Sequence, residues 1–241
     1  MASIYDIAEL PELLASNPYP GRGIVVGKSE DGKSAVIAYF IMGRSENSRN
    51  RVFTEREGNV FTEPHDYSKV QDPSLIIYSA IKAIENKLIV TNGDQTDTIY
   101  DFIANGKDMR DALRTREFEP DAPNLTPRIS AVLTFADKSF TYDMSILKSA
   151  DPEGTACNRY FYEYAPIAGL GHFIHTYVTD GNPLPTFVGE PERVKIPNDI
   201  DAFASEIWTN LDNNNKIAMH VRFIDLDSGE VESVTYNVHE V

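Results

Sequence analysis

A β-hairpin followed by a basic loop is encoded by residues 23–53, GIVVGKSEDGKSAVIAYFIMGRSENSRNRVF. The runs GIVVGK and SAVIAYFIM are rich in β-branched and aromatic residues, and they flank Glu30-Asp31-Gly32-Lys33. An Asp-Gly step between two such runs is a strong signal for a tight turn. The sequence therefore predicts two antiparallel strands, with a polar loop that starts at Gly43, where the second strand ends.

The loop after this hairpin is a positive island in an acidic chain, with three arginines against one acid, Glu46. Its polar side chains are Arg44, Ser45, Asn47, Ser48, Arg49, Asn50 and Arg51. The planar fork of arginine suits phosphate and carboxylate oxygens, and Ser and Asn add short-range donors and acceptors. Charge leaves two interpretations open: an anion or nucleotide-phosphate site, or a solvated loop whose arginines pair with surface acids.

Length and composition are those of an ordinary globular protein, and the even spread of apolar residues favours a single domain over residues 1–241. The formal charge of -15 argues against nucleic acid or an anionic membrane as a partner. This charge is still compatible with binding of a small anion, because a local positive pocket outweighs negative charges that lie farther away. Cys157 is the only cysteine, so neither an intrachain disulfide nor a cysteine-rich metal site is expected.

The first residues, Met-Ala-Ser followed by IYDIAELPELLAS, lack the basic start and unbroken apolar core of a signal peptide. No stretch approaches the roughly 18 apolar residues of a membrane helix. A soluble, cytoplasmic protein is therefore the expectation. Residues 3–16 predict a short amphipathic helix with Ser3 and Asp6 at capping-box spacing and Pro11 dividing it, and residues 1–16 form an N-terminal helical extension in this interpretation.

A turn cluster at residues 17–23, NPYPGRG, delivers Arg22 between two glycines, where backbone can approach a ligand closely. Further on, residues 59–63, 74–81 and 87–93 have the composition of strands, and Tyr78 lies in the second. Asp94 and Asp97 then have N-cap and N3 spacing for a helix that reaches about Ala104. Asp94 is either that N-cap or a ligand contact, since a helix N-terminus also offers free N–H groups to anions, with Gln95 and Thr96 facing a ligand.

The segment EFEPDAPNLTPR, residues 117–128, follows a charged helical stretch at residues 107–115 and is too rich in proline for a helix. Its polar residues Glu119, Asp121, Asn124 and Arg128 either line a cleft or are merely solvated. Residues 129–149 alternate on both sides of Asp137-Lys138, which predicts a hairpin.

Residues 158–167 and 171–180 are predicted to pair with each other around residues 168–171. His172 and His175 are three apart, which on a strand places them on opposite faces and argues against a shared metal. A packed or hydrogen-bonded role is expected for His175, and His172 is the better site candidate.

The last quarter of the chain predicts one helix and one hairpin. The helix runs from about Asp199 to Leu211, with Asn198 and Asp201 at N-cap and N3 spacing. The hairpin joins residues 216–226 and 230–238 through Asp227-Ser228-Gly229. Many antiparallel strands with three or four helices indicate an α+β layered fold.

Five segments together resemble the archaeal-type IMP cyclohydrolase family. They are YPGRGI (19–24), YFIMGRSENSRNRVF (39–53), VTNGDQTDTI (90–99), FEPDAPNLTPRISAV (118–132) and GLGH (169–172). The resemblance implies a four-layer αββα sandwich of the Ntn-hydrolase type, with two antiparallel sheets between helices. It also implies closure of the formamido-imidazole-carboxamide ribotide to IMP, the last step of purine synthesis, without metal or organic cofactor.

The chain departs from the Ntn-hydrolase pattern at its start. That fold uses a processed N-terminal Cys, Ser or Thr, whereas this sequence begins Met-Ala-Ser and its sole cysteine, Cys157, lies mid-chain. A covalent amidohydrolase mechanism is therefore not expected. The alternatives to a cyclohydrolase are a catalytically silent purine-nucleotide-binding module and an amidohydrolase with another substrate; self-association stays open.

Ring closure needs a fixed formyl rotamer, donors for the developing oxyanion and a positioned acid or base. On the resemblance, the residues assigned to catalysis are Arg22, Arg44, Tyr78, Asp94 and His172. Those assigned to substrate binding are Ser45, Asn47, Arg49, Arg51, Asn92, Gly93, Thr96, Glu119, Asn124 and Arg128. The arginines are expected to divide between the ribose phosphate and the reacting oxygen, with one or two paired to Glu46 or Glu55 instead.

Overall fold

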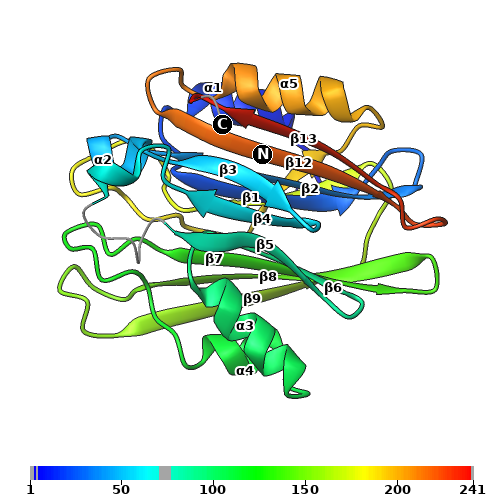
Figure 1. The fold of residues 1–241 in the computed structure, drawn as a ribbon, viewed down its shortest axis with the longest axis horizontal. Helices are drawn as coiled ribbons and strands as arrows, with labels where there is room; N and C mark the ends of the chain where they lie inside the picture. The colour runs from blue at the N-terminus through cyan, green and yellow to red at the C-terminus, as the bar shows by residue number, and fades with distance from the viewer. Residues whose placement is uncertain (1–2, 4, 71–76, 240–241) are drawn as a thin grey trace.

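Two antiparallel sheets pack face to face, and helices cover the outer face of each, so that the chain forms four layers (Figure 1). The computed structural model describes residue 3 and residues 5–70 and 77–239. The predicted αββα sandwich is confirmed. Among the described residues, no helix has the length and apolar character needed to cross a membrane.

The six-stranded sheet has the order β11-β10-β1-β2-β12-β13. Its strands are β1 (Arg22–Lys28), β2 (Ser34–Met42), β10 (Leu170–His175), β11 (Glu192–Lys195), β12 (Lys216–Asp225) and β13 (Val231–Asn237). Strand β2 lies at its centre and is buried on both faces, which explains the nearly continuous apolar run SAVIAYFIM. Alternate residues enter different cores: Tyr39 faces the other sheet, whereas Phe40 faces the helices.

The seven-stranded sheet keeps the order of the chain, β3-β4-β5-β6-β7-β8-β9. Its strands are β3 (Val52–Arg56), β4 (Asn59–Glu63), β5 (Tyr78–Ile84), β6 (Lys87–Thr91), β7 (Arg128–Ala136), β8 (Ser139–Ser149) and β9 (Cys157–Tyr164). The strand predicted over residues 74–81 starts at Tyr78 in the described part of the chain, and residues 74–76 lie outside the described residues. Strand β3 was not predicted.

Three apolar clusters hold the layers together. The central one lies between the sheets. A second packs α1 (Leu10–Ser16) and α5 (Ile200–Asn210) on the six-stranded sheet, and a third packs α3 (Gln95–Ala104) and α4 (Met109–Leu113) on the seven-stranded sheet. Two short helical turns, α2 (Glu46–Arg49) and η1 (Tyr67–Lys69), lie in the connections around β3 and β4.

The predicted hairpins are confirmed where the residues of the turn itself determine its conformation. Strands β1 and β2 pair across Asp31-Gly32, and β12 pairs with β13. The β7–β8 turn is made by Asp137 and Lys138, whose φ angles of 48° and 58° match the positive values that a tight two-residue hairpin turn requires.

Two helix boundaries differ from the prediction. The first helix begins at Leu10 rather than residue 3, with Pro11 in its first turn, because Ala8 instead bridges to Val194 at the edge of β11. The N-cap of α5 is Asp199, whose carboxylate accepts from the Ala202 N–H at 2.8 Å. The side-chain oxygen of Asn198 is used elsewhere, by the Asp31 N–H.

The predicted pairing of residues 158–167 with residues 171–180 is wrong. Strand β9 pairs with β8 at the edge of the seven-stranded sheet, whereas β10 pairs with β1 and β11 in the other sheet. The chain therefore crosses between sheets near Gly169, which has a φ of 75°. Glycine is needed at position 27 of β1, because a Cβ atom there would lie 2.5 Å from the Cα of the facing Gly171.

Candidate active site

Polar side chains from both sheets gather at one end of the sandwich, where several strands start or finish. Arg22 opens β1, Tyr78 opens β5 and Arg128 opens β7, while Thr91 closes β6. The antiparallel order brings these termini together from distant parts of the sequence. Whether a predicted site residue contributes to the site depends on the direction in which its side chain points at this end of the sandwich.

Arg22 and Arg51 bring two guanidinium groups close together beside the end of β2. Arg51 is 1% exposed and donates from Nε to the Ser48 carbonyl (2.6 Å) and from Nη2 to the Met42 carbonyl (3.3 Å). Burial, followed by the charge of Arg22, lowers the pKa of Arg51. Burial would also lower the pKa of Arg22, but Glu119 and nearby tyrosines hold it above its ordinary value.

Neither of these arginines has a carboxylate oxygen within 4.0 Å in the part of the chain that the structure describes. The Arg22 Nε is buried and, among the described residues, has no hydrogen-bond partner. A buried charge without a close ion-pair partner is costly. The pair is therefore suited to an anion supplied by a ligand.

Tyr39 and Tyr78 place two hydroxyl groups next to this pair. The hydroxyls lie 2.8 Å apart, Tyr39 is fully buried, and Tyr78 is 5% exposed. Burial, followed by the neighbouring Tyr78, raises the pKa of Tyr39 well above its usual value, although Arg22 and Arg51 oppose this. The Tyr39 hydroxyl is therefore neutral. When one donates to the other, the acceptor keeps its own proton for a further partner.

Tyr39 was not predicted as a site residue because it lies inside an apolar strand. The available signal was the alternation of β2, which places Tyr39 on the face that looks toward the other sheet. Tyr78, which was predicted, lies opposite it on β5.

Glu119 is a buried carboxyl within this arginine cluster. It is 4% exposed, and its main-chain N–H donates to the Thr126 carbonyl at 2.9 Å. Burial raises the pKa of Glu119, while the charges of Arg22 and Arg128 partly offset the rise. A carboxyl in this position is equipped to take up and release a proton.

Gly93 leaves the space in which Glu119 and Arg128 approach the start of α3. A Cβ atom at this position would lie 2.7 Å from the Arg128 Nη1 and 3.4 Å from the Glu119 Oε1. Any larger residue would therefore displace the Arg128 guanidinium. Gly93 contributes by the absence of a side chain.

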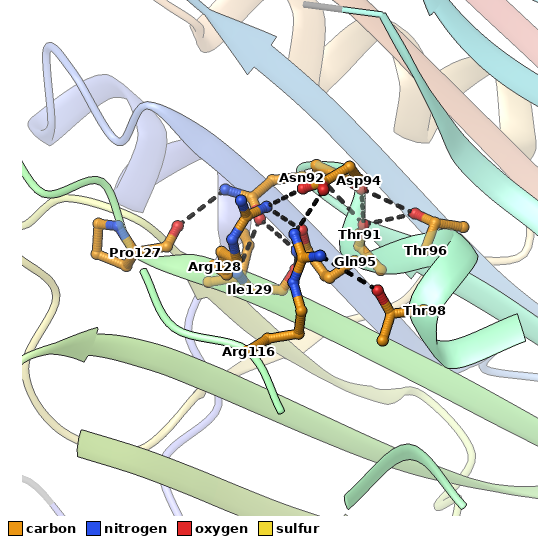
Figure 2. A network of polar contacts seen from close by, with 11 residues as sticks. Thr91, Asn92, Asp94, Gln95, Thr96, Thr98, Arg116, Pro127, Arg128 and Ile129 are labelled. Carbon is orange, nitrogen blue, oxygen red and sulfur yellow. Dashed lines mark hydrogen bonds and ion pairs between the residues drawn. The ribbon is translucent and has the colours of Figure 1, made fainter. Parts of the chain in front are cut away.

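Asn92 and Thr96 shape the turn before α3 and use their polar atoms inside it (Figure 2). The Asn92 Oδ1 accepts from the Ile129 N–H and from Gln95 Nε2, both at 2.9 Å, and its amide donates to the Pro127 carbonyl at 2.9 Å. The Thr96 hydroxyl lies 2.6 Å from that of Thr91. These two residues hold the turn that presents Gly93 and Asp94.

Asp94 occupies the N-cap position of α3 but makes no side-chain cap, so the predicted capping contact is wrong. Its Oδ1 lies 2.6 Å from the Arg128 Nη1, and its Oδ2 lies 2.5 Å from the Arg116 Nη2 (Figure 2). Burial works to raise the pKa of Asp94, but the hydrogen bond from Arg116 and the charge of Arg128 hold it below its ordinary value. Asp94 is thus a weak base that orients Arg128.

The basic loop divides its side chains between structure and site. The Ser45 hydroxyl caps α2 by accepting from the Ser48 N–H at 3.1 Å. Arg49 donates to the carbonyls of Gly43 and Asn214. Arg51 alone of the three loop arginines is buried. Asn47 has a buried Oδ1 without a partner among the described residues.

Arg44 and Asn124 both hold residues 178–189, which we call the strap. Arg44 Nη1 contacts the Asp180 Oδ1 at 2.5 Å and the Gly181 carbonyl at 2.8 Å. Its guanidinium also lies over the Tyr19 ring, 5.1 Å from the centroid. The Asn124 Oδ1 accepts from the Leu184 N–H at 3.1 Å. Because Tyr19 also acts on Arg22 and Arg51, Arg44 lies at the rim of the cluster that those two arginines form, whereas Asn124 supports the strap.

His172 belongs to a different cluster. Its Nδ1 lies 2.7 Å from the Tyr142 hydroxyl, and its ring stacks on Tyr164 with centroids 3.6 Å apart. Burial, assisted by Arg193, lowers the pKa of His172 to about 4. Val26 is its register partner and lies four positions along β1 from Arg22, which corresponds to about 13 Å.

The other histidine of β10 behaves as predicted. His175 faces the helical layer, where its Nδ1 contacts the Tyr177 carbonyl at 2.8 Å and its ring stacks on Phe173. The two histidines thus point to opposite faces of the strand, and His175 is a packed residue.

Comparison with known proteins gives a consistent result. The family model for "IMP cyclohydrolase-like protein" matches residues 19–229. The chain is 35% identical over 118 residues to an IMP cyclohydrolase of Methanopyrus kandleri, a match that covers 47% of this chain and 58% of the relative. It is 38% identical over 119 residues to an IMP cyclohydrolase of Methanococcus aeolicus, a match that covers 48% of this chain and 58% of the relative. It is 35% identical over 119 residues to an IMP cyclohydrolase of Methanocaldococcus jannaschii, a match that covers 48% of this chain and 56% of the relative.

The chain thus matches a little over half the length of these curated relatives. The family model extends the likeness across both sheets, from the residue before Pro20 to the β12–β13 turn. The resemblance drawn from the motifs is confirmed. The chain belongs to the IMP cyclohydrolase-like protein family.

Proposed function

We propose that this protein closes the ring of 5-formamidoimidazole-4-carboxamide ribotide to give IMP and water in purine nucleotide synthesis. One observation carries the proposal beyond family membership. Arg22 and Arg51 form a buried positive pair without a carboxylate partner among the described residues, directly beside two tyrosine hydroxyls and a buried carboxyl. A phosphorylated substrate with a reacting carbonyl would use all three kinds of group.

The arginine pair is assigned to negative charge on the ribotide. A phosphate dianion would supply the close ion-pair partner that Arg22 and Arg51 do not have among the described residues, and guanidinium groups bind phosphate through two parallel N–H donors. Water is largely excluded around Arg51, so the attraction is stronger there than at the surface. Arg44, at the rim, is assigned to the first contact with the incoming phosphate.

The chemical step joins the carboxamide nitrogen to the formyl carbon. As the N–C bond forms, the formyl oxygen gains negative charge, and the Tyr78 hydroxyl, oriented by Tyr39, donates to it. Each such donor contributes on the order of 3 kcal/mol to lowering the barrier. The rigid site also holds the formyl group in the attacking rotamer, and fixing the reacting groups in this way strongly accelerates an intramolecular reaction.

Glu119 is assigned to proton transfer. Its carboxylate takes the proton that the attacking amide nitrogen loses. Glu119 passes this proton to the formyl oxygen, which becomes the hydroxyl group of the carbinolamine. The carboxylate then takes the proton of the former formamide nitrogen and delivers it to the hydroxyl group, which leaves as water as the C=N bond forms. Acid–base catalysis of this kind contributes roughly 10²- to 10⁴-fold. The reaction as written needs no redox partner, and it needs no electrophilic group other than the hydrogen-bond donors named above.

We further infer a small-molecule ribotide as the partner, a cytoplasmic location and one domain over residues 1–241. These follow from the class of reaction and from the predicted absence of nucleic-acid and membrane binding on a chain of charge -15.

The direct test adds the formylated ribotide to the purified chain and follows the purine absorbance as IMP appears. Arg51→Met keeps most of the side-chain volume and removes the charge, and we expect KM to rise roughly 10- to 100-fold. Arg56→Gln is the matched control, because Arg56 is an exposed arginine of β3 that pairs with Glu63. Tight binding of IMP by the wild type without any turnover would make the chain a binding module and would overturn the proposal.

A further inference from the structure

We propose that Arg116 is a positioning residue that fixes Asp94 and, through it, aims Arg128 at Glu119. The inference deepens the proposed function, on which it rests. Arg116 lies just after α4, in a stretch whose sequence pattern assigned it no role. The structure instead places its guanidinium at the start of α3, between Asp94 and Thr98 (Figure 2).

The contact chain runs through three charged side chains. Arg116 Nη2 donates to the Asp94 Oδ2 at 2.5 Å, while the Asp94 Oδ1 lies 2.6 Å from the Arg128 Nη1. The carboxylate is therefore held from both sides, and its plane cannot turn without breaking one contact. Arg128 Nη1 also donates to the Gln95 Oε1 at 2.7 Å, and its side chain is 7% exposed.

The main chain of Arg116 is anchored as firmly as its guanidinium. Arg159 of β9 donates from Nη2 to the Arg116 carbonyl at 2.7 Å and from Nε to the Leu113 carbonyl at 3.2 Å. The edge strand and the end of α4 thus deliver the guanidinium to a defined place. The Thr98 hydroxyl is a weaker partner, at 3.4 Å from Arg116 Nη1.

Charge balance gives Arg116 an effect that a purely structural contact would lack. Asp94 with two arginines carries a net charge of about +1 toward the site, whereas Asp94 with Arg128 alone is close to neutral. The other charged groups that face Glu119 are Arg22 from β1, Arg51 from the segment before β3, and Asp121 from its own loop. Loss of Arg116 therefore makes the surroundings of the Glu119 carboxyl less positive, which favours its protonated form.

The test compares Arg116→Ala and Arg116→Lys with Arg114→Ala. Arg114 is a matched control, an exposed arginine two residues away that pairs with Asp111 within α4 and its C-cap. We expect Arg116→Ala to lower kcat roughly 10-fold with a change in KM of less than about 3-fold, because the aim of Arg128 changes while the phosphate contacts remain. The acid limb of the pH–rate profile is expected to move upward, and added methylguanidine to restore part of the rate.

Asp94→Asn provides the decisive background. In Asp94→Asn, Arg116→Ala is expected to cause a much smaller loss of kcat than in the wild type, because only the effect of its charge on Glu119 remains, and an equally large, multiplicative loss would overturn the inference. Equal kinetics for Arg116→Ala and Arg114→Ala would also overturn it. Thermal unfolding checks that each variant folds, and Arg116→Lys serves where the alanine variant does not.

A readout without turnover separates this inference from the proposed function. Carbon-13 NMR titration of the Glu119 carboxyl is expected to show a higher midpoint in Arg116→Ala than in the wild type. An inactive wild type with this shift would reject the cyclohydrolase and keep the positioning role. An active wild type without the shift would reject the positioning role alone.

Discussion

The hydroxyl of Tyr39 meets the hydroxyl of Tyr78 at 2.8 Å, and this contact joins β2 of one sheet to β5 of the other. Both rings are buried in the central core, and among the described residues neither hydroxyl has another hydrogen-bond partner. The pair lies beside Arg22 and Arg51, whose charges act on Tyr39. The hydrogen bond that links the two sheets thus lies at the site where the proposed reaction takes place.

Replacement of Tyr78 by phenylalanine tests this pair. We expect a loss of about 1–3 kcal/mol in the free energy of unfolding, because the Tyr39 hydroxyl becomes a buried, unpaired group. Denaturant titration measures the loss. In Tyr39→Phe/Tyr78→Phe the loss is expected to be smaller than the sum of the two single changes. Strictly additive losses would show that the hydroxyls do not act as a pair.

Arg51→Met is expected to separate stability from ligand binding. Removal of a buried charge that lacks a carboxylate partner among the described residues relieves repulsion with Arg22 and offsets the lost bonds to the Ser48 and Met42 carbonyls. The melting temperature without ligand should therefore change little, while the rise produced by IMP should shrink strongly. A variant that melts far lower but retains the full IMP effect would contradict the assignment of Arg51 to the phosphate.

Glu119→Gln is expected to change how stability depends on pH. Burial raises the folded-state pKa of Glu119 above its ordinary value of 4.5, so the protonated carboxyl favours folding at low pH and this contribution is lost as pH rises. The variant should therefore gain stability over the wild type as pH increases from about 4.5 toward 7. Urea unfolding at several pH values measures the difference, which should vanish in acid. A constant difference would contradict the raised pKa.

His172→Gln should act in the opposite direction. The pKa of His172 falls from 6.5 to about 4 through burial and Arg193, so protonation favours the unfolded chain and stability is lost as pH falls through that window. The full loss is up to about 3 kcal/mol. The variant, which keeps an acceptor near Tyr142, should lose less stability between pH 7 and 4, with the remaining fall due in part to His220. An unchanged profile would show that His172 does not contribute.

Asp180→Asn tests whether the strap competes with substrate for Arg44. The Arg44–Asp180 pair is about half exposed, and such pairs contribute only about 0–1 kcal/mol, so a phosphate can replace the carboxylate at little cost. We expect the variant to lower KM about 2- to 5-fold and Arg44→Ala to raise it. A KM that stays unchanged in both variants would leave Arg44 as a support of the strap alone.

The sequence by itself determined the sheet hairpins and the helix at residues 95–104, because the signals for these elements are local. Asp31-Gly32 and Asp137-Lys138 set tight turns, and alternation along β2 and β7 sets which residues face inward. The loop of arginines and the buried start of α3 were likewise visible as unusual groups of polar residues. Local chemistry of this kind does not depend on which strands become neighbours.

The tertiary structure alone decided which members of those groups enter the site. Arg49 and Arg51 are two residues apart and chemically identical, yet Arg49, at the end of α2, is half-buried and donates to the Asn214 carbonyl, whereas Arg51 is buried beside Arg22. Glu119 became the proton-transfer candidate only because its loop folds against Arg22, which lies nearly a hundred residues earlier in the chain. Burial and long-range charge depend on packing between distant segments, and no spacing within the sequence encodes them.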